Sequence, residues 1–416
     1  MSNVQSALGG LKSKVGMQPF GWVAVAALFV LFGYKQGYQA LRGMHGNDFK
    51  HIYIGATLLP RGLNPYDENL FDQAARSLGF ERINPYVYPP FTGLVLSFLR
   101  HWPPDDAAKV WFCLNHLMVI AALILCAHFL LGLRNPWPLA LVALMAATSF
   151  PLRRTLTAGQ LNCALLLIYS LLLAGEIRRR DWLSGLTVAF GTLFKLMPGI
   201  FIIYFLWKRR WRAVGWTALW LAALLAISVA IAGWDVHRAY LPVVREMGYG
   251  KSVWEQRLIA QGAEPFYRDP TNQSLNSLFH HLFAPDPLAR ITPWLALGGG
   301  AGHAAADTLT LLTSLALLFG ALWAIGWRRQ TSRSLNARDQ PSRESLDVAA
   351  MILLSILIPS ILWDHYLVVL FLPQIVLLAH VLARGQWRTW RMAALIAASA
   401  LLAWPIAYPT IWTADG

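Results

Sequence analysis

The sequence predicts an all-α protein, a polytopic transmembrane helical bundle, from its composition and from the arrangement of its apolar residues. Of its 416 residues, 56% are hydrophobic and 13% are charged, whereas a soluble globular domain carries about 25% charged residues. The apolar residues form long blocks close to the ~20 residues that span ~30 Å of hydrocarbon. No polar face runs through these blocks, which argues against a large soluble protein with buried helices. Such segments predict about ten crossings, most clearly at residues 216–232, 308–327, 351–363 and 366–384.

The basic residues indicate topology rather than nucleic-acid binding. The formal net charge is +14, and Lys and Arg gather in short clusters between apolar segments. Short loops rich in Lys and Arg stay on the cytoplasmic side of a membrane. These clusters lie around residues 178–180, 208–212, 328–343 and 384–391. The three cysteines are scattered without a CxxC spacing, so they indicate neither a disulfide framework nor a metal site.

The beginning of the chain predicts a cytoplasmic N-terminus at residues 1–19, followed by a single transmembrane domain at residues 20–411. The first helix follows Lys12 and Lys14. No small-residue cleavage site comes after it, so we interpret it as an uncleaved span. It leads to a polar, turn-rich external loop at about 43–87. Short juxtamembrane helices are expected in that loop.

Parity shows that one of the next apolar segments does not cross the membrane. Four crossings that start outside would end outside, although the cluster at 177–182 is predicted to be cytoplasmic. The first of the four is short and begins with Pro89-Pro90, so we interpret it as a partial or re-entrant helix. This choice places residues 151–162 on the external side. The four segments lie at about 88–100, 107–132, 137–152 and 161–176.

A short helical hairpin is predicted at residues 183–207. About 27 residues separate two cytoplasmic clusters there, and at ~1.5 Å per residue they are too few for two complete spans and a loop. Lys195 and Pro198 lie at the centre of this segment. The rest of the predicted topology consists of a second external loop at 233–291 and cytoplasmic loops at about 177–182, 208–212, 328–346 and 385–391.

Ionisable residues at or inside a membrane are functional candidates, because their burial is costly unless they are paired. Asp48 follows the first helix, where it is either an N-cap of the next helix or a catalytic carboxylate. Lys195 at the hairpin tip favours phosphate binding as a compact cation over snorkelling to an interface. Arg153 and Arg154 are phosphate ligands if they lie outside, and cytoplasmic anchors if the parity choice is wrong.

Two further polar pairs belong to the same side of the membrane in this topology. Gln160 and Asn162 lead into an apolar helix, where capping explains one amide more easily than two. Asp364 and His365 close another span, and a carboxylate beside a histidine suits acid–base chemistry or sugar binding. Alternatively, the pair is interfacial, and its neighbours Trp363 and Tyr366 form an aromatic belt. The groups together predict an external pocket for a lipid-linked phosphate, with one carboxylate, several cations and apolar walls.

The order of these motifs resembles glycosyltransferase family 87, the polyprenyl-phosphate-dependent membrane glycosyltransferases with the GT-C fold. The resemblance extends from about residue 40 to residue 385. The lysine motif departs from the family. In many relatives proline directly follows the lysine, whereas here Pro198 comes three residues after Lys195. The motifs are Asp48 with Tyr53, Asn64-Pro65-Tyr66-Asp67, Tyr88-Pro89-Pro90, Gly159-Gln160-Leu161-Asn162, Lys195-Leu196-Met197-Pro198, Asn272-Gln273-Ser274-Leu275 and Trp363-Asp364-His365.

The resemblance implies an inverting transfer of a sugar, mannose in characterised members, from a polyprenyl monophosphate to an acceptor hydroxyl of a glycolipid or glycan. The reaction would take place on the external, periplasmic face of the cell membrane. Asp48 would be the general base, and Lys195 with Arg153 or Arg154 would stabilise the departing phosphate. Substrate-binding residues would be Tyr53, Gln160, Asn162, Asn272, Asp364 and His365. The branch is metal-independent, and no second acid pairs with Asp48 in a DxD arrangement, so neither a metal nor a cofactor is expected.

A flippase or transporter of lipid-linked sugars or polyprenyl phosphate is the main alternative, since it would also need intramembrane cations and an apolar groove. The large external loop with an isolated acid after the first helix favours the enzyme. The lack of a clear internal repeat also argues against transporter folds built from repeated halves.

Overall fold

The computed structural model describes residues 18–80, 83–246, 269, 271–284, 297, 300–331, 340–384 and 389–404. Within these residues the chain is helical, and its only strand-like contact is an isolated bridge between Asn272 and Trp363. The predicted all-α bundle is therefore confirmed. Several predicted segments lie wholly or partly outside the described residues: the N-terminus up to residue 17, most of the second external loop, and parts of the last two cytoplasmic loops.

The helices of the first half alternate between long spans and short irregular elements, and several of them are broken by π or 3-10 turns. In chain order they are α2 (Gln18–Phe32), η2 (Gly33–Gln39), α3 (Ala40–Arg42), α4 (Asn47–Leu58), η3 (Leu59–Arg61), α5 (Glu68–Ser77), α6 (Pro90–Val95), η4 (Ser97–His101), α7 (Pro104–Cys126), η5 (Ala127–Leu131), α8 (Pro136–Thr148) and α9 (Phe150–Ala158).

The second half contains the central helix of the bundle and the predicted hairpin. Its elements are α10 (Asn162–Ile177), α11 (Asp181–Phe194), η6 (Met197–Gly199), α12 (Ile200–Trp207), α13 (Trp211–Ala232), α14 (Trp234–Glu246), α16 (Leu275–Phe283), α17 (Gly300–Thr331), α18 (Gln340–Leu357), η9 (Asp364–Leu370), α19 (Phe371–Ala383) and α20 (Trp390–Ala403).

Fewer helices than predicted have the length and composition of a membrane span. Five continuous helical segments of the described chain are long and apolar enough, and the pair α8 and α9, bent by 51° at Ser149, makes a sixth if it is one span. The predicted count of about ten is therefore not supported. The difference arises because several apolar blocks form short helices, such as the 16-residue α10, which is buried almost along its whole length.

The two irregular segments have the short helices predicted for them. The segment at 88–100 contains only the six-residue α6 and the 3-10 helix η4, and six residues rise only ~9 Å. The segment at 183–207 is a hairpin of α11 and α12 joined through η6, with Lys195 at its turn. The Thr92 hydroxyl donates to the Phe194 carbonyl oxygen at 2.6 Å, so α6 is fastened to the hairpin tip.

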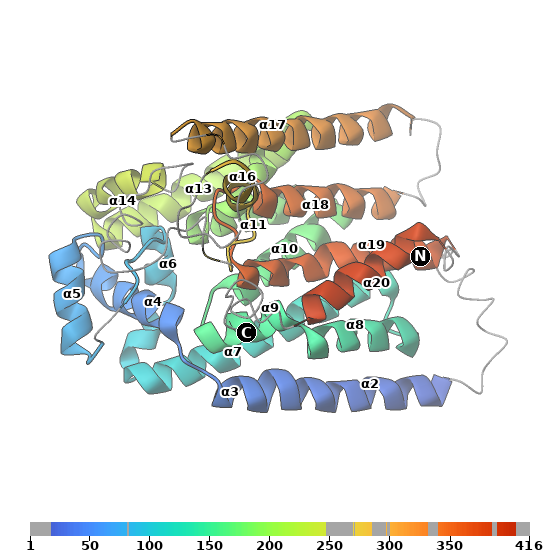
Figure 1. Ribbon diagram of the computed structural model, residues 1–416, viewed down its shortest axis with the longest axis horizontal. Helices are drawn as coiled ribbons and strands as arrows, with labels where there is room; N and C mark the ends of the chain where they lie inside the picture. Colours follow the sequence, from blue (N-terminus) through green and yellow to red (C-terminus); the bar gives the residue numbers. More distant parts are fainter. Residues whose placement is uncertain are drawn as a thin grey trace.

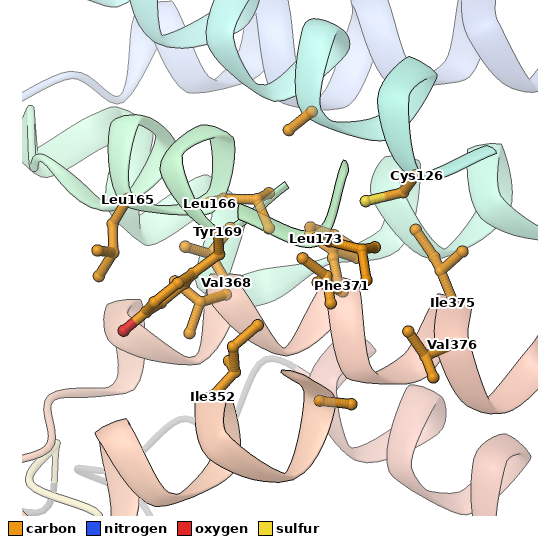
Figure 2. Close-up of a cluster of buried hydrophobic side chains, with 14 of the residues drawn as sticks. Cys126, Leu165, Leu166, Tyr169, Leu173, Ile352, Val368, Phe371, Ile375 and Val376 are labelled. Carbon is orange, nitrogen blue, oxygen red and sulfur yellow. The ribbon is translucent and has the colours of Figure 1, made fainter. Parts of the chain in front are cut away.

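The apolar core is built around α10. Figure 2 shows side chains of this helix packed against residues from α7, α18, η9 and α19. Tyr169 lies at the centre of this core, and its hydroxyl donates to the Ser355 Oγ at 2.8 Å. The buried hydroxyl is therefore satisfied, as burial requires. The labelled members of the cluster are Cys126, Leu165, Leu166, Tyr169, Leu173, Ile352, Val368, Phe371, Ile375 and Val376.

The long helices share one direction, and the short external-loop helices gather at one end. In Figure 1, α2, α17, α18 and α19 run along the long axis of the molecule, whereas α4, α5, α6 and α14 lie together at its left end. Helix α4 packs on α6 and α7, and α14 packs on α6. The juxtamembrane helices expected after the first span therefore form a cap over one end of the bundle.

Candidate active site

A sharp turn between α9 and α10 presents the amide residues predicted from sequence. Gly159 ends α9 with φ +75°, a conformation that favours glycine. A Cβ atom at this position would lie 2.6 Å from the Phe49 Cβ. The Trp111 indole donates to the Gly159 carbonyl oxygen at 2.9 Å. The turn is thus held closely against α4, which carries Asp48.

The same turn positions the start of α4. The backbone amides of His45 and Gly46 both donate to the Thr157 carbonyl oxygen, at 3.1 Å and 3.0 Å. Gly46, with a left-handed φ of 59°, is the N-cap of α4, and the His45 Nδ1 accepts from the Asn47 amide at 3.3 Å. Asp48 lies in the first turn without capping it. The capping explanation of Asp48 is therefore wrong.

Asp48 is partly exposed. It interacts electrostatically with Lys195, Tyr88 and Tyr366. Within the described part of the chain, no side chain makes a hydrogen bond or an ion pair with it. A carboxylate in this position is accessible to an incoming hydroxyl group.

Lys195 is buried at the hairpin tip, with 7% of its surface exposed. Its Nζ donates to the Asn162 Oδ1 at 2.7 Å and lies 3.7 Å from the centroid of the Tyr366 ring. Both partners are neutral, and the cation–π contact stabilises the ammonium without cancelling its charge. Among the described residues Lys195 has no salt bridge. Its charge is therefore compensated only through space by Asp48, which leaves it suited to bind an anion.

Asp364 and His365 form a second charged group in η9. The Arg154 Nε lies 3.2 Å from the Asp364 Oδ2, and the His365 Nδ1 lies 3.3 Å from the Asp364 Oδ1. The backbone of His365 accepts two further bonds, from the Thr155 hydroxyl at 2.9 Å and the Asn162 Nδ2 at 3.1 Å. Asn162 therefore joins the Lys195 side to the His365 side of the cluster.

Gln160 belongs to a buried aromatic group next to Asp48. Its Oε1 accepts from the Tyr88 hydroxyl at 2.9 Å, and the Tyr88 ring stacks on His51, with the ring centroids 5.7 Å apart. Burial lowers the pKa of His51 to about 4, while nearby Asp48 opposes this shift. His51 is consequently neutral near pH 7. Burial and the neighbouring Arg154 also lower the pKa of His45.

Three predicted residues make their described contacts away from Asp48 and Lys195. The Tyr53 hydroxyl donates to the Trp102 carbonyl oxygen at 2.8 Å, which fastens α4 to the chain after η4. Arg153 lies about 100° around α9 from Arg154. Asn272 orders the chain before η9, since its Oδ1 accepts from the Leu362 amide at 3.0 Å. Direct substrate contacts of these three residues stay predictions.

The structure adds residues to which the sequence assigned no role in the site. Tyr366 contacts Lys195, whereas the sequence offered it only as a member of an alternative aromatic belt. His51 is three residues after Asp48, a spacing that places both on one face of a helix. Both ring nitrogens of His51 and the Nε2 of His365 are buried without a hydrogen-bond partner among the described residues. That helical spacing was the one signal in the sequence that pointed to His51.

The fold and the cluster together define the class of protein. A helical membrane bundle presents a carboxylate without a bound partner near a buried cation, an arginine and several amides. Such a group can take a proton from a hydroxyl while it holds an anionic leaving group. These properties are those of a membrane glycosyltransferase.

Comparison with known families agrees with this class. The model of glycosyltransferase family 87 matches residues 86–358, more than half of the chain. The protein belongs to glycosyltransferase family 87. The resemblance deduced from the order of the motifs is thereby confirmed.

The similar curated proteins are mycobacterial glycosyltransferases. A polyprenol-phosphate-mannose-dependent alpha-(1-2)-phosphatidylinositol pentamannoside mannosyltransferase of Mycolicibacterium smegmatis is 30% identical over 195 residues, which cover 46% of this chain and 45% of that protein. An alpha-(1->3)-arabinofuranosyltransferase of Mycobacterium tuberculosis is 26% identical over 173 residues, covering 40% of this chain and 37% of that protein. The matched region spans less than half the length of either relative. No solved structure gives a significant match.

Proposed function

We propose that the protein transfers a mannosyl group from a polyprenyl-phosphate donor to a hydroxyl of a glycolipid or glycan acceptor, with inversion at the anomeric carbon. The observation that carries this proposal is the pair of Asp48 and Lys195. The carboxylate has no hydrogen-bond partner among the described residues, and the buried ammonium has only neutral partners in contact. The mannose-dependent relatives support the choice of sugar.

In the proposed reaction the acceptor hydroxyl attacks the anomeric carbon from the face opposite the phosphate. A bond forms between the acceptor oxygen and that carbon, and the bond between the carbon and the phosphate oxygen breaks. Asp48 takes the hydroxyl proton, and the electron pair leaves with polyprenyl phosphate. General-base catalysis of this kind contributes about 10²–10⁴-fold to rate. Lys195 stabilises the charge that develops on the leaving phosphate.

The remaining cluster residues are proposed to position the substrates. Arg154 is held at 3.2 Å from the Asp364 carboxylate, and its other guanidinium nitrogens are proposed to bind the phosphate together with Arg153. Asp364, His365 and Gln160 are proposed to bind sugar or acceptor hydroxyls. Asn162 holds Lys195 in place through its Oδ1. Tyr53 and Asn272 are proposed to act on substrate through the segments that they order.

The reaction is proposed to take place at the external face of the cell membrane, without a metal or a cofactor. The basic loops at 177–182 and 208–212 support this orientation through the positive-inside rule. They follow the ends of α10 and α12, whereas the start of α10 lies in the candidate site. At ~1.5 Å per residue, the 16 residues of α10 separate the two ends by ~24 Å.

Arabinofuranosyl transfer and lipid flipping are the two alternatives to this proposal. The arabinofuranosyltransferase relative favours an arabinofuranosyl donor as a second candidate. A flippase for lipid-linked sugars would need the cation and the apolar bundle but not an unpaired carboxylate.

The experiment is a donor screen with purified protein in lipid nanodiscs. Polyprenyl-phosphate mannose, glucose and arabinofuranose are each supplied with a glycolipid acceptor extract, and released polyprenyl phosphate is measured. Mannose turnover that persists with EDTA is the expected result. Turnover of the arabinofuranosyl donor alone supports the second candidate. Donor translocation in proteoliposomes without turnover of any donor supports the flippase.

The Asp48→Asn variant tests the proposed base in the same assay. It should bind donor and lower turnover by about 10²–10⁴-fold. Asp67→Asn is the matched control, because Asp67 caps α5 through the Leu70 amide at 3.1 Å, and Asn caps a helix equally well. The control should retain wild-type turnover. Retained turnover by Asp48→Asn would remove the proposed base.

A further inference from the structure

A cavity lies at the other end of the bundle, where α18, α19 and α20 meet. Its volume is about 350 Å³, which is within the ~300–1,000 Å³ range of small-molecule sites. Helix α19 packs on both α18 and α20. Helix α19 starts directly after η9, which carries Asp364 and His365, and its 13 residues rise ~20 Å before Arg384. The lining residues are Leu346, Leu377, His380, Arg384, Trp390, Arg391 and Ala394.

The lining divides into an apolar wall and a basic rim. Leu377 and His380 share one face of α19, as Arg391 and Ala394 share one face of α20, because residues three apart are neighbours on a helix. Arg384 ends α19 as its C-cap residue. Two guanidinium groups and an imidazole therefore border a cavity whose other four lining side chains are apolar.

We propose that this cavity binds the phosphodiester headgroup of an anionic membrane phospholipid, with the start of its acyl chain on the apolar wall. Arg384 and Arg391 supply charge-assisted donors to phosphate oxygens. Basic pockets between transmembrane helices are suited to such headgroups. The site is separate from the proposed transfer reaction and does not depend on it.

The composition of the lining selects the charge of the lipid. A zwitterionic headgroup carries an ammonium beside its phosphate, and none of the lining residues is acidic. The nearby carboxylates of α18, Glu344 and Asp347, are engaged by Lys208 at 2.6 Å and 3.0 Å. An anionic headgroup thus matches the cavity, whereas an ammonium would meet two guanidinium groups.

An exposed tryptophan at the cavity favours a lipid over a dissolved anion. The Trp390 side chain is largely exposed, at 75%, and the Arg391 guanidinium carbon lies 5.6 Å from the centroid of its ring. Exposed tryptophans of membrane proteins lie at the level of the headgroups. Helix α20 also exposes Leu401, which lies seven residues after Ala394 and therefore on the same face of the helix. The cavity is thus bordered by an apolar surface suited to contact hydrocarbon.

The test measures lipid retention by the purified full-length protein with native mass spectrometry. Phosphatidylglycerol and phosphatidylcholine of equal chain length are compared. Wild type should retain phosphatidylglycerol preferentially, and Arg384→Gln/Arg391→Gln should weaken that retention by about tenfold. Arg212→Gln is the matched control, because Arg212 is an exposed arginine at the start of α13. It should leave retention unchanged.

A cavity-filling variant tests the site, and inorganic phosphate as a soluble probe tests the assignment to a lipid. Leu377→Trp fills the cavity from its apolar wall without changing charge, and it should also abolish the preference. Sugar-transfer turnover in phosphatidylcholine should be unchanged in all variants that fold. Equal retention of both lipids by wild type, or equal loss in Arg212→Gln, would overturn the site. Thermal stabilisation by inorganic phosphate equal to that by phosphatidylglycerol would overturn the lipid assignment.

Discussion

Two charged clusters lie at opposite ends of α10, and they differ in whether each charge has an oppositely charged partner. At the far end, buried Glu176 pairs with Arg210, which also pairs with Asp181, and Lys208 pairs with Glu344 at 2.6 Å. At the near end, the ammonium of Lys195 contacts an amide and an aromatic ring. Every charge named in the far cluster has an oppositely charged partner in contact, whereas Lys195 and Asp48 have none among the described residues.

Structural and functional charges in this membrane bundle differ in their partners. Removal of one partner from a buried ion pair leaves an uncompensated charge, so such pairs hold helices together. A charge with neutral partners keeps most of its field available to a ligand. The far cluster joins α10, α11, α12, α13 and α18, and the near cluster is the candidate active site. Substitutions of the paired charges in the far cluster should therefore lower stability and spare activity. Substitution of Lys195 in the near cluster should weaken donor binding and change stability little.

The largest effect on stability is expected from Arg210→Met. The variant leaves Glu176, with no exposed surface, without its cationic partner, although Ser184 still donates to it at 2.7 Å. The free energy of unfolding should fall by about 3 kcal/mol, measured by unfolding in mixed micelles with SDS. Turnover of the folded variant at low temperature should equal that of wild type. The control Arg212→Met removes an exposed arginine two residues later and should change stability by less than ~0.5 kcal/mol.

Lys195→Met should affect donor binding rather than stability. The substitution preserves length and removes a buried charge that has only neutral partners in contact. Donor affinity should weaken by about 10–100-fold, since a hydrogen bond to a charged group contributes ~1.5–3 kcal/mol, while stability changes little. Titration with a non-hydrolysable polyprenyl-phosphate sugar measures the affinity. Lys208→Met, its lysine counterpart in the far cluster, should lose stability and keep donor affinity. Unchanged donor affinity in Lys195→Met would contradict its phosphate role.

The smallest effect is expected at His51, which lies beside Asp48. Burial lowers its folded pKa from 6.5 to about 4. Below pH 6.5 the unfolded chain binds a proton that the folded chain does not, so stability falls as the pH decreases and levels off below about pH 4. His51 should account for a loss of about 2 kcal/mol between pH 7 and pH 5. His51→Phe keeps a ring against Tyr88 and should reduce this loss by that amount, measured as unfolding free energy at both pH values. Parallel pH profiles of variant and wild type would contradict a neutral, buried His51.

Most residues of the candidate site could be predicted from the sequence, but the contacts between them could not. Asp48, Lys195, Arg154, Gln160, Asn162 and the Asp364-His365 pair stand out because polar residues are rare in an apolar chain. Their contacts are non-local: Arg154 and Asp364 are 210 residues apart, and Lys195 and Asn162 are 33 apart. Arg153 has the same residue type as Arg154 and lies next to it. The two arginines differ in the direction in which their side chains leave α9.

The helical membrane class, the family and the short lengths of the segments around residues 88–100 and 183–207 were predictable from sequence. These properties depend on local quantities, namely hydropathy, proline positions and the spacing of basic clusters. The tertiary structure was needed to show how many described helices have the length of a span, since the apolar α10 is short and buried by protein. It also decided which polar groups meet at Asp48. Contacts between distant helices depend on side-chain packing and on turns such as that at Gly159, and hydropathy carries no information about either.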